Sequence, residues 1–423
     1  LASAVIYTFT PYRAVDVYVR GTVGESFALA IFPFVVYFLF RLSKNQNSKN
    51  ILLCTVSVSA LILSHQIACL LFLPPIFILF AILCKKSIKS LLLVTVFSIC
   101  LTAYYLLPTL LEQSFIQPVS PFNFIDHFPF IKQLIYSPWG YGSSHWGPDD
   151  QISFQIGVIN LLVVAVTLIK IKSNKSITNG FLFLFFLSAI FMNIRTKFFW
   201  ELFLLTPLIQ FPWRLLMLTT FFSSALSIFI FASKKLQSIK ILAPVIIFFT
   251  IIFSISYFQV GERTQNSDSY FLRHYLPTAV LLPGETVSKD YLSYSEEYYP
   301  LPVGATRPKA VPIQKLSAPP STITITDSNP LAYSALVNAT SSTMATYHVF
   351  DYPGWTVYLN NQRIPHSKDA LGAITFDLPP GESNITIKYE DTPLRAFSNF
   401  LSLASILTLL ATLLKPKHKP IYN

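Results

Sequence analysis

Long apolar runs constrain this chain more than any other feature of its sequence. Runs of about 15 to 23 residues recur, and a helix needs about 20 residues to cross about 30 Å of hydrocarbon. Hydrophobic residues make up 52% of the 423 residues and charged residues only 12%, against roughly 25% charged in an ordinary soluble domain. Barrel strands would instead give short alternating segments. We therefore expect an α-helical polytopic membrane protein.

The runs predict about nine membrane spans. They lie near residues 24–41, 51–65, 67–84, 90–111, 154–169, 180–194, 213–232, 240–259 and 396–414. Lys49 precedes the second span, and Lys85 and Lys86 follow the third. Residues 51–84 are therefore predicted to form a tight helical hairpin with His65 at its tip.

Basic residues gather in the short loops on one side of these spans. They are Arg41, Lys44, Lys49, Lys85, Lys86, Lys89, Lys170, Lys172, Lys175, Lys234, Lys235, Lys240, Lys415, Lys417 and Lys419. These loops hold 15 of the 31 basic residues and none of the 20 acidic residues. The positive-inside rule makes them cytoplasmic. The net charge of +11 is then a topology signal and does not indicate a nucleic-acid partner. We expect a multi-pass protein of the plasma (inner) membrane.

Outer segments divide the chain into four parts. A multi-span domain, 1–260, carries outer loops at 1–24 and 112–153, and the 8–26 stretch has the spacing of a short interfacial helix. A proline-rich outer connector, 261–317, precedes residues 318–393, which we expect to form a small outer all-β sandwich. Residues 394–423 supply a final transmembrane helix and a basic cytoplasmic tail.

Alternation of apolar and polar residues carries the strand prediction. It is found in "STITITD", "ATYHVFDY", "WTVYLN", "AITFDL" and "NITIKYE". Asn360 and Asn361 tolerate positive φ and predict a hairpin turn in "YLNNQRI", and "LPPGES" predicts another turn.

Arginines near the outer ends of spans are candidate phosphate ligands. Arg13 and Arg20 are seven residues apart and would share a helix face, and guanidinium groups suit phosphate oxygens. Arg214 begins a span in "FPWRLL" and is a second candidate clamp. The alternative is that these arginines are interfacial anchors. His65 is a candidate proton carrier or donor, or a structural hydrogen-bonding residue.

The stretch 137–157 combines aromatic, glycine and acidic residues. Trp139, Tyr141 and Trp146 alternate with glycines and would suit stacking on a sugar ring, or would form an interfacial aromatic belt. His145, Asp149 and Asp150 are candidate ligands for a divalent cation, Mg²⁺ or Mn²⁺. One aspartate is alternatively a general base, or the pair caps the next helix.

Several motifs together resemble a known family. They are "PYRAVDVYVRGTVGESFALAIFP", "LILSHQIA", "SPWGYGSSHWGPDDQISFQIG", "FPWRLL" and "FDYPGWTVYLNNQRIP … LPPGESNITIKYEDTPLR". In this order they resemble the bacterial multi-pass membrane family labelled "6-pyruvoyl-tetrahydropterin synthase-related". The resemblance covers nearly the whole chain and implies a GT-C architecture, like that of polyprenyl-phosphate-sugar-dependent glycosyltransferases.

The resemblance implies a sugar donor, a glycan acceptor and a catalytic acidic residue. The partners would be a polyprenyl-phosphate-linked sugar, an envelope glycan acceptor and membrane lipid. The main catalytic acid of such enzymes usually lies in the first outer loop, which we expect upstream of Leu1. Within this chain the candidate catalytic residues are Asp16, Glu25 and His65. The alternative function is a non-catalytic envelope protein that handles or transports glycan or lipid-linked sugar. The sequence leaves the oligomeric state open.

Overall fold

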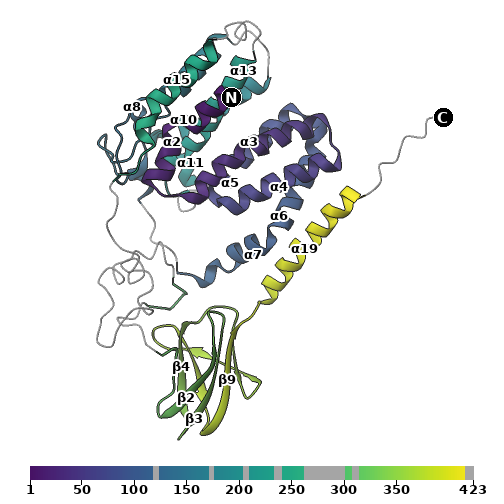
Figure 1. Ribbon diagram of the computed structural model, residues 1–423, viewed down its shortest axis with the longest axis vertical. Coiled ribbons are helices and arrows are strands. Elements are labelled where there is room, and N and C mark those ends of the chain that lie inside the picture. Colours follow the sequence, from purple (N-terminus) through teal and green to yellow (C-terminus); the bar gives the residue numbers. More distant parts are fainter. Residues whose placement is uncertain are drawn as a thin grey trace, which may run out of the picture. The chain divides into compact units, whose positions relative to one another are not determined.

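The chain divides into two compact units. The computed structural model describes residues 1–117, 123–170, 176–202, 209–232, 241–261, 301–306 and 314–414 (Figure 1). Unit 1 comprises Leu1–Thr102, Pro121–Arg263 and Ala404–Asn423, and unit 2 comprises Ala103–Ser120 and Thr264–Leu403. Most of the predicted connector, 261–317, and the predicted tail beyond residue 414 lie outside the described residues.

Unit 1 is built from helices. The longer ones are α3 (Val23–Lys44), α4 (Ser48–Ser64), α5 (Gln66–Leu83), α6 (Ile88–Leu101), α9 (Val158–Lys170), α10 (Ser176–Phe191), α13 (Leu216–Phe231) and α15 (Leu242–Ser254). The shorter ones are α1 (Ala2–Thr8), α2 (Pro11–Ala14), α8 (Ile131–Ile135) and α11 (Lys197–Leu202). A π-helical turn, η1 (Val15–Val19), and a 3₁₀ turn, η6 (Pro212–Leu215), position the site described below.

Several helices are long and apolar enough to cross a membrane. Among the described residues there are 4 such helices, Val23–Lys44, Gln66–Leu83, Pro212–Phe231 and Pro393–Thr412, or 6 if each of two broken helix pairs is one span. Three more apolar helices, at Ser48–Ser64, Val158–Ile169 and Leu242–Tyr257, are shorter. The prediction of a polytopic helical fold is consistent with this set, whereas nine full spans are not confirmed.

Two predicted spans are broken in the structure. The 180–194 span continues only to Phe191, after which the chain turns by 92° into Ile194–Leu202. Asn193 Oδ1 accepts the backbone N–H of Arg195 there. In the 90–111 span, α6 ends at Leu101, and the chain turns by 74° into Ala103–Leu111.

The hairpin predicted for residues 51–84 is confirmed. Helix α4 ends at Ser64 and α5 begins at Gln66, so His65 is the single residue between them. Figure 1 shows α3, α4 and α5 grouped together. Phe32 of α3 stacks on Phe72 of α5 with ring centroids 3.7 Å apart. Burial of such large side chains, each of the order of 1.5–3 kcal/mol, holds helix faces together.

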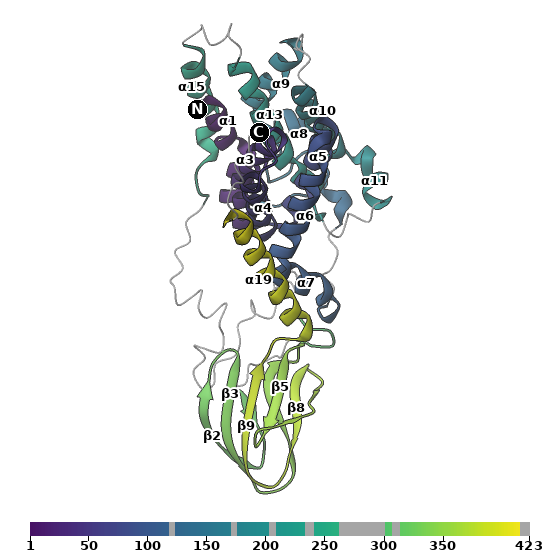
Figure 2. The same ribbon diagram turned by 90° about the vertical axis from the view of Figure 1, so that its right-hand side faces the viewer.

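Unit 2 carries two antiparallel sheets. Its strands are β1 (Leu316–Ser317), β2 (Ser321–Ser328), β3 (Ala332–Ala339), β4 (Thr343–Phe350), β5 (Trp355–Leu359), β6 (Gln362–Ile364), β7 (Ser367–Lys368), β8 (Ala373–Leu378) and β9 (Gly381–Tyr389). One sheet has the order β1-β4-β8-β7 and the other β2-β3-β9-β5-β6. Figure 2 shows β2, β3, β9 and β5 next to one another.

Both sheets contribute to one hydrophobic core. Val337 of β3, Ile385 of β9 and Phe376 of β8 belong to it. The five segments predicted as strands overlap β2, β4, β5, β8 and β9, but the prediction missed β3, "AYSALVNA". Alanine, serine and asparagine are poor strand formers, and the position of β3 between β2 and β9 outweighs that preference.

The turn predictions can also be checked. Asn360 and Asn361 have φ of 49° and 65° and close the β5–β6 hairpin, which confirms that prediction. The "LPPGES" turn is confirmed as a turn, but it connects β8 of one sheet to β9 of the other. Gly381, with φ of 96°, provides the positive backbone angle there.

A buried ion pair joins three parts of unit 2. Glu112, 5% exposed, follows α7 (Ala103–Leu111), and Arg395 lies in the first turn of α19 (Pro393–Leu414). Arg395 donates to Glu112 Oε2 from Nε at 3.1 Å and from Nη2 at 2.6 Å. Its guanidinium also lies over the rings of Tyr352 and Tyr389. These contacts fix the start of α19 against the β strands.

Candidate functional site

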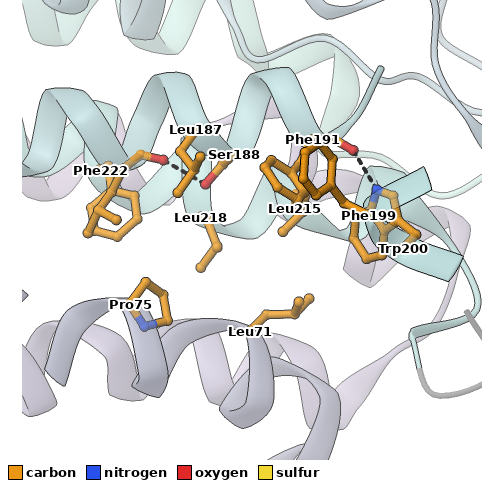
Figure 3. A pocket seen from close by; sticks show the side chains of 11 residues that line it. Leu71, Pro75, Leu187, Ser188, Phe191, Phe199, Trp200, Leu215, Leu218 and Phe222 are labelled. Carbon is orange, nitrogen blue, oxygen red and sulfur yellow. Dashed lines mark hydrogen bonds between the residues drawn. The ribbon is translucent and has the colours of Figure 1, made fainter. Parts of the chain in front are cut away.

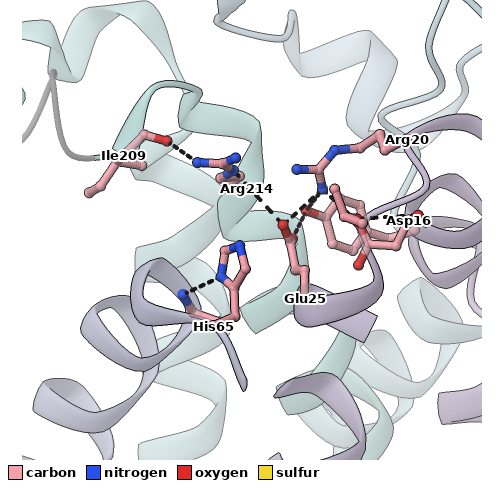
Figure 4. Close-up of polar contacts among 9 residues, drawn as sticks. Asp16, Arg20, Glu25, His65, Ile209 and Arg214 are labelled. Atoms are coloured by element: carbon pink, nitrogen blue, oxygen red, sulfur yellow. Dashed lines mark hydrogen bonds and ion pairs between the residues drawn. The ribbon is translucent and has the colours of Figure 1, made fainter. Parts of the chain in front are cut away.

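A cluster of charged side chains lies where η1, α3 and η6 meet in unit 1. It consists of Asp16 in η1, Arg20 directly after η1, Glu25 in the first turn of α3, and Arg214 in η6 (Figure 4). Asp16 and Glu25 are both 0% exposed, and Arg214 is 7% exposed. We call these four residues the charge cluster. Buried charges of this kind need partners or a task.

Arg20 is the hub of the charge cluster. Its Nη1 atom lies 2.6 Å from Asp16 Oδ1 and 2.9 Å from Glu25 Oε2. The same atom donates to the Tyr12 hydroxyl at 3.2 Å. The guanidinium carbon lies 4.7 Å from the ring centroid of Trp213, which adds a cation–π contact. One guanidinium therefore contacts two carboxylates that have lost their hydration.

Glu25 is shared between the two arginines. The Tyr12 hydroxyl donates to its Oε1 at 2.5 Å, and Arg20 binds its Oε2. Arg214 Nε lies 3.9 Å from the same Oε2, and Arg214 Nη1 donates to the carbonyl of Ile209 at 2.8 Å. Two arginines and two carboxylates give the charge cluster a formal charge of zero when Asp16 is ionised.

Asp16 and Tyr12 have perturbed acidities. Burial raises the pKa of the Asp16 carboxyl well above its usual range, Glu25 raises it further, and Arg20 and Thr22 oppose the shift. Burial, followed by Glu25 and Asp16, also raises the pKa of Tyr12. Asp16 Oδ2 is buried without a hydrogen-bond partner among the described residues. Asp16 is thus the side chain of the charge cluster best suited to hold a proton.

His65 lies beside the charge cluster at the tip of the helical hairpin. Its Nδ1 accepts the backbone N–H of Ala68 at 3.0 Å and thereby caps α5. Burial lowers the pKa of His65, Glu25 opposes this, and Arg214 and Arg20 lower it further. Because Nδ1 must keep its lone pair to act as the cap, the neutral ring carries its proton on Nε2.

Three helices begin at the charge cluster. They are α3, which contains Glu25, α5, which is capped by His65, and α13, which follows Arg214. Unpaired N–H groups make a helix N-terminus electropositive. The basic ends lie away from the charge cluster, since α3 ends at Arg41 and Lys44 and α4 begins beside Lys49. The charge cluster therefore lies at the lysine-poor ends of these helices, where the positive N-terminal ends of the three helix dipoles meet.

A glycine lets α3 approach the hairpin tip. A Cβ atom at Gly24 would lie 2.7 Å from the carbonyl oxygen of Ser64 and 3.5 Å from Cδ2 of His65. We expect Gly24→Ala to destabilise unit 1 by about 1–3 kcal/mol, as overpacking does, measured by thermal unfolding in detergent. Ala30→Gly, an exposed site of α3, is the control for helix propensity and should cost no more than about 1 kcal/mol. An unchanged melting temperature for Gly24→Ala would contradict the close contact.

The stretch 137–157 is connected to the charge cluster through Trp213. Trp213 Nε1 donates to the Ser144 hydroxyl at 3.2 Å, and that hydroxyl lies 2.8 Å from His127 Nδ1. Phe154 also packs on Trp213, with centroids 5.8 Å apart. Since the Trp213 ring contacts the Arg20 guanidinium, this stretch helps to fix the position of Arg20 through Trp213.

The three predicted sugar-stacking residues have different surroundings. Trp139 contacts Tyr141, with centroids 6.0 Å apart, and stacks on Tyr257. The Tyr141 hydroxyl donates to the carbonyl of Gln259. Trp146, 50% exposed, packs on Phe130 instead. Trp139 and Tyr141 thus support the chain after α15, and Trp146 is the most exposed candidate ring.

One of the three predicted cation ligands, Asp150, is occupied with local bonds. Asp150 accepts the Gln133 amide at 2.7 Å and the backbone N–H of His145 at 2.9 Å. Asp149 is exposed. Among the described residues no three His, Cys, Asp or Glu side chains gather in a way that could hold a metal ion. Asp150 therefore acts as an acceptor that shapes its loop, and a cation there stays a prediction.

The arginines predicted to act together have separate partners. Arg13 lies over the ring of Tyr7 at 5.2 Å, whereas Arg20 lies in the charge cluster. The cause is the π-helical turn, in which the N–H of Arg20 bonds to the carbonyl of Val15 five residues earlier. Seven residues then no longer complete two α-helical turns. Arg214, by contrast, does meet Arg20, around Glu25.

Tyr12 and Trp213 are site residues that the sequence prediction missed. Both contact Arg20, and each directly precedes an arginine in a quoted motif, "PYR" and "PWR". An aromatic residue next to an outer arginine was thus an available signal. This signal becomes informative only once it is known that Tyr12 and Trp213 both contact Arg20.

An apolar cavity lies beside the charge cluster within unit 1. Its volume is about 170 Å³. Its walls include Leu71 and Pro75 of α5, Ser188 and Phe191 of α10, Trp200 of α11, and Leu215, Leu218 and Phe222 of η6 and α13 (Figure 3). The Ser188 hydroxyl and the Trp200 Nε1 donate to backbone carbonyls, so the cavity offers almost no polar partner. Its apolar walls suit apolar groups.

Comparisons with family models, with curated proteins and with solved structures each found no match to this chain.

Proposed function

We propose that this chain belongs to a membrane glycosyltransferase that transfers a sugar from a polyprenyl-phosphate donor to a cell-envelope acceptor. The proposal includes a GT-C-like architecture of about nine spans and the family resemblance stated above. It also includes a plasma-membrane location, with the charge cluster and a β-sandwich formed by the two sheets on the outer side.

One observation carries this proposal. Two buried arginines, Arg20 and Arg214, meet at the N-termini of three helices, next to an apolar cavity. Positive groups of this kind stabilise the charge that develops on a phosphate leaving group. An apolar cavity at the same place suits the hydrocarbon chain of a lipid-linked donor.

Individual residues then receive roles. Arg214 and Arg20 hold the donor phosphate, while Tyr12 and Glu25 orient Arg20. Asp16 keeps or accepts a proton and is the candidate base within this chain. Trp146 is the candidate for stacking on a sugar. A divalent cation remains part of the proposal, but no step is routed through it.

A non-catalytic envelope protein that handles lipid-linked sugar is the second candidate. One observation favours it: Asp16 and Glu25 already balance the charges of Arg20 and Arg214. A balanced cluster can be purely structural, since buried ion pairs contribute to specificity in some folds. Such a protein would bind a polyprenyl-phosphate sugar without releasing polyprenyl phosphate.

Sugar transfer by membranes that contain the full-length protein tests the proposal. We expect labelled sugar to move from a polyprenyl-phosphate donor to envelope material, and Arg214→Ala to lower the rate about 100- to 1000-fold. Glu25 keeps Arg20 and Tyr12 in that variant, so the fold should persist. Arg195→Ala, at an exposed arginine, is the matched control. Donor binding without any turnover in the wild-type protein would contradict the transferase and support the second candidate.

A further inference from the structure

Two hydrogen-bond donors beside Glu25 lack an acceptor. Arg214 is 7% exposed, and its Nε is buried without a hydrogen-bond partner among the described residues. Glu25 Oε2, at 3.9 Å, is too far for that bond. Figure 4 shows the imidazole of His65 directed toward the Arg214 side chain.

The protonation of His65 follows from its role as a helix cap. Its Nδ1 accepts the N–H of Ala68, so the neutral ring presents Nε2–H on its other side. The described residues offer no partner to this Nε2 atom. Two donors, one of them positively charged, therefore face the same space.

The buried Arg214 Nε favours an acceptor beside it. A buried donor left unpaired costs about 1–3 kcal/mol, and more when it is charged. The N-termini of α5 and α13, which adjoin His65 and Arg214, add positive potential. Glu25 is already held by Arg20 and Tyr12. An oxyanion supplied by a ligand satisfies both donors.

The same two elements line the cavity one to two turns further on. Helix α5 carries His65 at its cap and Leu71 in the cavity wall, while η6 and α13 carry Arg214 and then Leu218. Six residues of helix span about 9 Å. A ligand with an oxyanion at one end and a hydrocarbon chain at the other matches this succession of polar and apolar walls.

We propose that Arg214 Nε–H and His65 Nε2–H bind one phosphate oxyanion between them, and that the adjoining cavity holds the first carbons of a lipid chain attached to that phosphate. His65 is then a ligand-binding residue that acts in its neutral form. The choice of a lipid phosphate rests on the proposed function, whereas the oxyanion site rests on the two donors alone.

Substitutions at His65 separate helix capping from ligand binding. Serine retains an N-cap acceptor but removes the imidazole donor, and alanine removes both. Binding of farnesyl phosphate, inorganic phosphate and farnesol to the purified full chain is measured by calorimetry, together with the melting temperature. We expect His65→Ser to weaken farnesyl phosphate binding roughly 10- to 100-fold with little change in melting temperature. His65→Ala should weaken binding equally and also lower the melting temperature.

Two further variants serve as controls. Asn47 caps α4 by accepting the N–H of Asn50, so Asn47→Ser is a matched cap exchange that should leave binding unchanged. Leu218→Trp fills the cavity and should remove the advantage of farnesyl phosphate over inorganic phosphate. Equal affinity of the wild-type protein for these two probes would assign the site to free phosphate and overturn the lipid part.

Wild-type affinity in His65→Ser, or no binding of either phosphate by the wild-type protein, would overturn the oxyanion site itself. Failure of this inference can be distinguished from failure of the proposed function, because the binding measurements need no sugar transfer. Phosphate binding that depends on His65, in a protein that transfers no sugar, would leave this inference standing and remove only the transferase.

Discussion

Replacing Arg20 with methionine is expected to lower the free energy of unfolding of unit 1 by about 3–5 kcal/mol, the cost of breaking a buried ion pair. Arg20 is the closest positive partner of both Asp16 and Glu25, and each carboxylate is 0% exposed. Methionine retains an unbranched apolar stem but removes the guanidinium, so the loss reports on the two ion pairs and on the cation–π contact with Trp213. Denaturant or thermal unfolding in detergent measures it.

Arg195→Met is the matched control for Arg20→Met. Arg195 is an exposed arginine of the same unit, and surface substitutions usually stay within about 0.5 kcal/mol. Adding Asp16→Asn to Arg20→Met should recover part of the stability, because one unpaired buried charge is removed. Equal stability of Arg20→Met and Arg195→Met would show that Arg20 does not stabilise Asp16 and Glu25, which contradicts its role as the hub of the charge cluster.

Replacing Arg395 with methionine is expected to lower the stability of unit 2 by about 3 kcal/mol. Glu112 is 5% exposed and would retain only the Thr392 and Tyr352 hydroxyls, at 3.2 and 3.5 Å. The stacking of the guanidinium on Tyr389 would also be lost. Unfolding followed by tryptophan fluorescence reports on this unit through Trp355, which lies in its core.

A double-mutant cycle isolates the Glu112–Arg395 pair. The double variant Glu112→Gln and Arg395→Met should be more stable than the sum of the two single changes predicts, since no unpaired charge is left behind. Arg363→Met, at an exposed position of β6, is the control and should cost less than about 0.5 kcal/mol. Strict additivity would mean that the two side chains do not interact.

Local patterns explain which parts of the fold were predictable. The positions of α3, α5 and α13 follow from apolar length, and the hairpin tip at His65 follows from the lysines that flank it. Period-two alternation located β2 and β8 in the same way. These signals depend only on neighbouring residues, so no tertiary contact was needed to read them.

Other features depend on contacts that a local pattern does not contain. The breaks after Phe191 and Leu101, with turns of 92° and 74°, lie inside apolar runs that read as continuous spans. The strand β3 exists because β2 and β9 pair with it on both sides. Its own residues have weak strand preference, so its sequence alone did not reveal it.

The candidate site also combines features that the local sequence predicts with features that depend on tertiary contacts. Asp16, Arg20, Glu25, His65 and Arg214 were recognisable in the sequence because ionisable groups at the ends of apolar helices are costly without a partner. The sequence could not assign their partners. Arg13 and Arg20 share a seven-residue spacing, yet a π-helical turn separates them, while Arg214, almost two hundred positions later, shares Glu25 with Arg20.

The sequence by itself therefore determined that the chain has apolar helices of membrane length, a strand-rich segment near its C-terminal end and a set of ionisable residues at the helix ends. These properties follow from composition and period, which act over a few residues. Only the tertiary structure decided that Glu25 lies between two arginines, that Trp213 supports Arg20 and that His65 presents a donor toward Arg214. Coulombic and hydrogen-bond energies depend on distances between side chains, and folding sets those distances by bringing remote segments together.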